Sequence, residues 1–264
     1  MKKFLLIAVL IAAMLSVTAY VACIATPLLG KNIKGSGKIV AKYVPAPDFD
    51  GIEASRAVKV VISDEVSDIR IEADDNLIDL VVVRAVKGKL EATLDQKVNN
   101  IQNGNVTITV PANGKIRSLD ASSASKIVSE VMLKADKFSI EASSAARIET
   151  AVEATSCTIE TSSASKVEAS VEAGSCSLDA SSASKITLEG SARTFKADMS
   201  SASKLDAEKF SAVNATIDTS SAANVSIDCS GKLTASASSG SSIRYSGDCQ
   251  TSLEKSSGGS IRKL

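Results

Sequence analysis

The sequence contains no histidine and no tryptophan, and aromatic residues make up only 3% of its 264 residues. Without histidine, a Ser-His-Asp triad, a Cys-His pair and a His-ligated metal site are all excluded. The scarcity of aromatic rings also leaves few platforms on which nucleic-acid bases could stack. The 30 basic and 30 acidic side chains cancel, so the chain has no basic excess with which to neutralise phosphates. We therefore expect no nucleic-acid partner.

The N-terminus has the pattern of a targeting segment. Two lysines precede an uncharged, largely apolar run over residues 4–30. This pattern predicts a signal peptide or an N-terminal membrane anchor over residues 1–29, with a plausible cleavage site after Ala19. Cys23 is a candidate for lipidation, although the residues before it match a lipoprotein motif poorly. All three alternatives export the rest of the chain to the periplasm or the outer cell surface, with membrane contact only through the N-terminus.

A signature of small residues, Ser-Ser-Ala-Ser or a close variant, recurs through the C-terminal half. Its copies begin at Ser122, Ser143, Ser162, Ser181, Ser200, Ser220, Ser238 and Ser256. A nearly constant period in a long chain is typical of stacked repeats. Between the signatures, apolar and polar residues alternate with a period of two, which predicts β-strands. The small residues are expected to form a sharp corner, whose serine hydroxyls satisfy free backbone groups.

A unit of about 19 residues is too short to fold alone, but stacked units can bury a shared core. The sequence therefore predicts an all-β protein, a single-stranded parallel β-solenoid (β-helix) of about twelve coils. We expect the solenoid domain to span residues 30–264, with degenerate coils over 30–118 and regular coils over 119–264. The degenerate coils are inferred from an apolar-acidic-Ala step that recurs every 19 residues, at Ile52, Ile71 and Leu90.

Two segments resemble a known family. Segment 35–55, GSGKIVAKYVPAPDFDGIEAS, has a Gly-x-Gly start followed by Phe-x-x-Ile. Segment 61–94 has a valine-rich strand, an acidic turn and the phrase Ala-Asp-x-Asn-Leu. Together with the Ser-Ser-Ala-Ser repeats, these segments resemble the putative auto-transporter adhesin head GIN domain family. The resemblance implies a right-handed β-solenoid on an exported bacterial protein, often a lipoprotein of Bacteroidetes-type bacteria, and it supplies no catalytic residues.

Charged residues flank the serine corner in most units. Acidic residues precede it at Asp120, Glu141, Glu160, Asp179, Asp198 and Asp218. Basic residues follow it at Lys126, Arg147, Lys166, Lys185 and Lys204. By alternation both sets point outward, so each should form a column of like charge along the rod. In one interpretation the two columns neutralise each other across the corner. In the other they form a ligand-facing charged edge that binds a repeating polymer such as a glycan.

Four cysteines lie beyond the N-terminal segment. Cys157 and Cys176 occupy equivalent inward positions in neighbouring units, and Cys229 and Cys249 lie 20 residues apart. They could remain buried thiols that act as small apolar groups. An exported compartment would equally permit two disulfides between neighbouring coils. The sequence leaves both alternatives open.

The function that these features favour is that of an exported, non-enzymatic adhesin-like or scaffolding protein. The alternative is a polysaccharide-binding or polysaccharide-degrading β-helix protein. The even spacing leaves no long loops to wall a catalytic cleft, apart from the polar segment 95–104. A lattice binder is disfavoured because the serines lie at a bend between charges. We expect no catalytic residues, metal or cofactor. The expected partners are a glycan or another cell-surface component, or a second copy bound through the solenoid ends.

Overall fold

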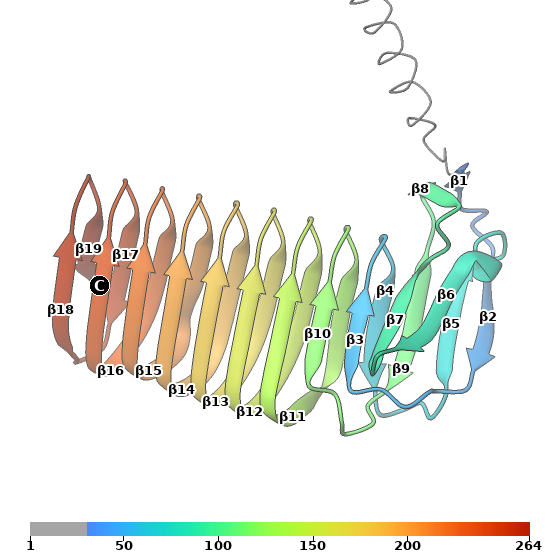
Figure 1. Ribbon diagram of the computed structural model, residues 1–264, viewed down its shortest axis with the longest axis horizontal. Helices are drawn as coiled ribbons and strands as arrows, with labels where there is room; N and C mark the ends of the chain where they lie inside the picture. Colours follow the sequence, from blue (N-terminus) through green and yellow to red (C-terminus); the bar gives the residue numbers. More distant parts are fainter. Residues whose placement is uncertain (1–30) are drawn as a thin grey trace, which may run out of the picture.

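The computed structural model describes residues 31–264, so the predicted signal peptide or anchor, with Cys23, lies outside the described residues. The described chain forms a long, flattened β-solenoid (Figure 1). Two layers of strands lie back to back and are joined along one edge by tight turns. The predicted all-β parallel β-solenoid is thus confirmed. From residue 31 onward, no helix is long and apolar enough to cross a membrane.

The regular part of the solenoid begins near residue 118. Its strands are β10 (Ser118–Ala121), β11 (Lys126–Ala142), β12 (Arg147–Thr161), β13 (Lys166–Ala180), β14 (Lys185–Met199), β15 (Lys204–Thr219), β16 (Asn224–Ala237), β17 (Ser242–Ser246), β18 (Gln250–Lys255) and β19 (Ser260–Lys263). Each long strand follows one layer, bends and returns along the other layer to the next turn. Neighbouring coils pair in parallel and mostly in register, so equivalent side chains stack.

The Ser-Ser-Ala-Ser signature forms the tight turn. In the turn over residues 162–165, Ser163 and Ala164 have φ angles of 53° and 60°. The amide of Ser165 donates to the carbonyl of Ser162 over 3.2 Å. Two consecutive positive φ angles with such a bond are typical of a type I′ turn, which reverses a twisted strand tightly. Small side chains are used here because larger or branched ones clash more in the left-handed region.

The buried serine hydroxyls of the turns bond the backbone, as predicted, but they bond carbonyls that already have a backbone partner. The hydroxyl of Ser165 is buried and donates to the carbonyl of Ala142, in the preceding coil, over 2.9 Å. Ser125 and Ser203 make equivalent bonds to the carbonyls of Ala54 and Ala180. Each of these carbonyls also accepts the amide of the first serine of a turn, as Ala142 does from Ser162 over 3.0 Å. The bond therefore satisfies the buried hydroxyl, which without a partner would cost about 1–3 kcal/mol.

The core is a thin layer between the two sheets. Inward positions are filled by stacked aliphatic and small side chains, which suit the short distance between the layers. Phe138, Phe195 and Phe210 are the largest fully buried side chains. The rings of Phe195 and Phe210 lie 5.3 Å apart at an angle of 56°, a favourable tilted arrangement.

The N-terminal part differs from the predicted run of degenerate coils. Its elements are β1 (Lys31–Lys34), β2 (Ile39–Val44), β3 (Gly51–Ala54), β4 (Lys59–Ser63), β5 (Ile69–Asp74), the 3-10 helix η1 (Ile78–Leu80), β6 (Val81–Val86), β7 (Lys89–Leu94), β8 (Val98–Gln102) and β9 (Val106–Pro111). Only β3, β4, β7 and β9 extend the parallel coils. Strands β2, β5 and β6 pair antiparallel and close this end of the solenoid.

Because β2, β5 and β6 form an antiparallel cap, the solenoid has about eight turns of roughly 19 residues, fewer than the twelve coils predicted. Ile52 and Leu90 stack in one column as predicted, and Leu119 continues that column. Ile71 does not join it, because β5 runs antiparallel opposite Ile108. The 19-residue step was therefore accidental at Ile71: alternation of apolar and polar residues gives no strand direction.

Candidate functional site

An unbroken column of carboxylates runs along one face of the solenoid, beside the turn edge. Its members pair in register, strand by strand, and we call them the acidic ladder: Glu91, Glu53, Asp120, Glu141, Glu160, Asp179, Asp198 and Asp218. Neighbouring members are about one strand spacing apart, about 4.8 Å. The six that were predicted from the sequence are thus brought together. Glu53 and Glu91 were missed because β3 and β7 are not stacked in chain order.

A shallow groove of about 200 Å³ lies between the acidic ladder and the turns. It is lined by carboxylates of the ladder and by the first hydroxyl of successive turns, at Ser143, Ser162 and Ser181. On the same face, a second column next to the ladder carries hydroxyls at Ser139, Thr158, Ser177 and Thr216, with Lys196 between the last two. The face therefore presents hydrogen-bond acceptors and hydroxyls at a constant spacing.

Few cations neutralise the acidic ladder. Lys89 lies 3.7 Å from Asp120 and Arg84 lies 2.6 Å from Glu91, both near the N-terminal end. From Glu141 to Asp218, the described ion pairs include no member of the ladder. Partial burial raises the pKa of Asp120 above its usual value, and the adjacent carboxylate of Glu141 acts in the same direction, whereas Lys89 opposes both. The ladder therefore keeps most of its negative charge uncompensated within the molecule.

A second column of charge follows the turns on the opposite face. This basic ladder consists of Lys59, Lys126, Arg147, Lys166, Lys185 and Lys204, again in register. Its ion pairs stay on its own face: Lys126 lies 2.6 Å from Glu149, and Lys166 pairs with Glu168. The hydrogen bond from Lys166 is the largest cause that lowers the pKa of Glu168.

The predicted neutralisation of the two columns across the corner is not formed. None of the ion pairs described from residue 31 onward joins a member of one ladder to a member of the other. The physical reason is the turn itself. It reverses the chain between back-to-back layers (Figure 1). Glu160 ends a strand in one layer and Lys166 begins the next strand in the other, and both are outward positions by the alternation of burial. One face therefore carries the acidic ladder, and the opposite face carries the basic ladder together with its partners Glu149 and Glu168.

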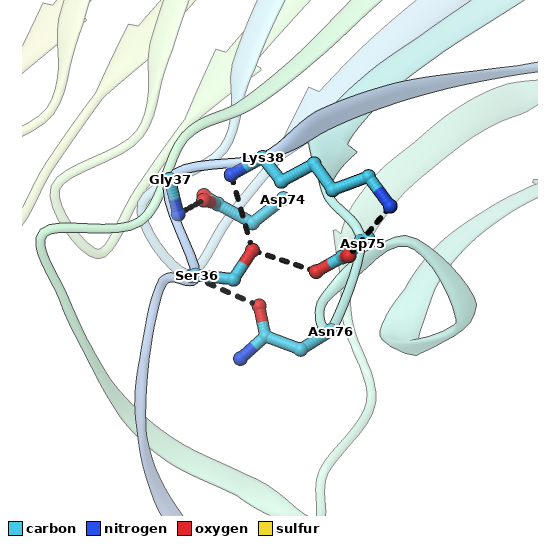
Figure 2. A network of polar contacts seen from close by, with 6 residues as sticks. All are labelled: Ser36, Gly37, Lys38, Asp74, Asp75 and Asn76. Atoms are coloured by element: carbon cyan, nitrogen blue, oxygen red, sulfur yellow. Dashed lines mark hydrogen bonds and ion pairs between the residues drawn. The ribbon is translucent and has the colours of Figure 1, made fainter.

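A polar clamp joins the N-terminal segment to the cap (Figure 2). The buried carboxylate of Asp74 accepts bonds from the amides of Gly37 and Asn105 over 2.6 and 2.7 Å. Beside it, Asp75 accepts a 2.6 Å bond from the hydroxyl of Ser36, and Asn76 accepts one from the amide of Ser36. The Ala-Asp-x-Asn-Leu phrase thus has a structural role: it fastens the incoming chain to β5.

The four described cysteines are free thiols. Cys157 and Cys176 are buried and stack in register on β12 and β13, as predicted. The hydrogen bond with Cys157, with burial, raises the pKa of Cys176 well above its usual value. Burial raises the pKa of Cys229 to about 11, and a contact with the thiol of Cys249 adds to this. The disulfides remain predictions, and neither thiol pair lies in the ladder region.

Comparison with known proteins agrees with the fold. A family model described as "Putative auto-transporter adhesin, head GIN domain" matches residues 48–249. The chain belongs to this family. No curated protein matches the chain. Similar solved structures include a putative adhesin from Parabacteroides merdae, with 18% identity over 88% of this chain and 99% of that chain and a TM-score of 0.80. A putative adhesin from Parabacteroides distasonis has 17% identity over 89% and 100% of the two chains and a TM-score of 0.79.

Another protein from Parabacteroides distasonis, named a putative lipid binding protein, has 16% identity and a TM-score of 0.74 over 89% of this chain and 100% of that chain. At these identities the likeness establishes the fold alone. Within residues 31–264, no group of three or more side chains is placed to hold a metal ion. Because the coils stack in register, each coil contributes an equivalent set of groups to a face. Such a face is suited to repeated weak contacts.

Proposed function

We propose that this family member is an exported, non-enzymatic adhesin-like protein whose contact surface is the turn edge with its two charged ladders. The observation that carries the proposal is the acidic ladder: eight carboxylates in register, whose ion-pair partners among residues 31–264 lie at one end. Stacked like charges destabilise a fold, so a ladder kept over eight strands favours a role in contact over a role in stability. The family supports an adhesin-like role in general terms.

The proposed ligand is a glycan or another component of a cell surface that repeats at a spacing comparable to the coils. Each coil would contribute one carboxylate and neighbouring hydroxyls, and many weak contacts in series would give avidity. The clamp around Asp74 suits this role, because it ties the solenoid to the chain segment that leads back to the predicted export signal. A pulling force on a bound rod would be transmitted through these bonds.

Binding to intact cells tests this proposal. Purified protein spanning residues 31–264, which holds every described strand and the core, is titrated onto bacterial cells and onto a glycan array. The variant Glu141→Gln, Glu160→Gln, Asp179→Asn is expected to lose most of the binding. A matched control, Glu153→Gln, removes an exposed carboxylate that lies outside the ladder. Binding that is unchanged by the triple variant, or no binding at all, would overturn the assignment.

A further inference from the structure

The two ladders are complementary to each other, although they do not meet within one molecule. Both flank the same turn edge, but they project from opposite faces. The acidic ladder ends at Asp218, where Ser236 follows in register, and the basic ladder ends at Lys204, where Asn224 follows. The charged stretches therefore cover nearly the same coils. One face thus carries the acidic ladder beside the edge, and the other carries the basic ladder, with Glu149, Glu168 and Asp206 in the column next to it.

A second copy can pair its basic ladder with the acidic ladder of the first without any rotation. If it is displaced along the normal to the sheets, its lysine face meets the carboxylate face of the first copy, with the turn edges aligned. Packed sheets lie about 10 Å apart, a gap that Glu and Lys side chains can bridge. Because both molecules have the same coil spacing, a match at one coil, such as Glu160 opposite Lys166, places the adjacent coils in register as well.

We propose that the partner of the acidic ladder is the basic ladder of a second copy of this chain, so that the solenoids stack face to face. This inference rests on the proposed function and names the cell-surface component that the ladder contacts. The contact joins two different surfaces, and therefore each added copy offers a new acidic and a new basic face. Such heterologous contacts do not close on themselves, so they give an open stack of variable length.

Several charged groups are free for this contact. Arg147, Lys185 and Lys204 take part in none of the ion pairs found in the described chain, and the same holds for Glu160 and Asp179 on the other face. A single exposed ion pair is weak, but pairs repeated over successive coils act together once the copies are aligned. Copies tethered to one surface would meet at a high effective concentration, which favours the stack further.

Sedimentation velocity on residues 31–264 tests the proposal with charge exchange. The acid-swap variant carries Glu160→Lys, Asp179→Lys and Asp198→Lys, and the base-swap variant carries Lys166→Glu, Lys185→Glu and Lys204→Glu. Each alone has two faces of like charge at these coils and is expected to stay monomeric, whereas an equimolar mixture is expected to associate. Wild type is expected to form species beyond a dimer at about 0.1 M NaCl and to dissociate at about 1 M, where the screening length falls from about 10 to about 3 Å.

Circular dichroism verifies that each variant is folded. If a swap variant fails to fold, it is replaced by the milder variant Lys166→Gln, Lys185→Gln, Lys204→Gln, which is also expected to be monomeric. The control Glu130→Lys, Glu153→Lys, Glu172→Lys has the same charge change as the acid swap but lies away from the turn edge, and it should associate like wild type. Three results would refute the stack: wild type that is monomeric at low salt, stacks that persist at high salt, and a mixture of the two swap variants that stays monomeric. In those cases, cell binding that still depends on the ladder would leave the adhesin-like role intact.

Discussion

Neutralising one carboxylate of the acidic ladder should stabilise the protein. Glu160 stands in register between Glu141 and Asp179, so it has a like charge on each side at about 4.8 Å. In water, two unit charges at this distance repel by about 0.9 kcal/mol, and screening at physiological salt reduces this to about 0.5 kcal/mol. With two neighbours, Glu160→Gln should raise the free energy of unfolding by about 1 kcal/mol. Side chains that fan apart would lower this figure, and the lower effective dielectric constant near a protein surface would raise it.

Urea unfolding of the wild type and the variant at two salt concentrations provides the measurement. At about 1 M NaCl the repulsion nearly vanishes, and the gain should shrink to about 0.3 kcal/mol. Glu153→Gln is the matched control, because Glu153 stacks between Lys134, at 2.7 Å, and Glu172. Attraction and repulsion offset each other there, so no gain is expected. If Glu160→Gln destabilised the protein, or if its gain did not depend on salt, the ladder would not be a column of unpaired like charges.

Four further results are expected. Phe195→Ala should cost about 3–5 kcal/mol in urea unfolding, because it leaves a cavity in a thin, fully buried core. Asp74→Ala should cost about 3 kcal/mol and speed hydrogen exchange over residues 35–38, since a backbone amide there loses its acceptor. The native state raises the pKa of Asp120, so ionisation of this carboxyl lowers the stability of the protein as the pH rises. Asp120→Asn should therefore have a higher free energy of unfolding than wild type at pH 7. This gain should vanish below the usual aspartate pKa. Cys249, which is half-buried, should react with a thiol reagent before the buried cysteines.

The regular half of the fold is predictable from sequence because its determinants are local. The turn over residues 162–165 needs small side chains at two left-handed positions, and the flanking strands need alternation. Both requirements are visible in any single unit, and the constant period shows that the units stack. The sequence also predicts that the serine hydroxyls bond the backbone, but the acceptor of Ser165 is the carbonyl of Ala142 in the preceding coil, which only the stacking of the coils supplies.

The cap and the pairing of charges could not be predicted in the same way. Alternation in β5 is equally compatible with parallel and antiparallel pairing, and the choice is set by long-range packing that no local pattern records. The separation of six positions between Glu160 and Lys166 suggests that the two charges lie close together. The structure shows that four of the five residues between them form the turn, so the charges lie on opposite faces. Spacing thus gives the members of each ladder but not their partners.

Within the described residues, β18 and β19 pair with a neighbouring coil on one side only, so their other edge is a separate candidate for association. Its inward positions, however, hold Thr251 and Lys255 in the columns of Leu233 and Ala237. A polar group and a cation at core positions, with further cations on β19, disfavour the pairing of an exposed strand edge with another chain. Leu253 is the inward residue left partly exposed there. The predicted self-association through the ends is untested, but this chemistry opposes it. The double variant Thr251→Leu, Lys255→Val should then form end-to-end dimers. These dimers should persist at high salt, unlike the face-to-face stack. A variant that stays monomeric at high salt would show that these two residues do not block the end.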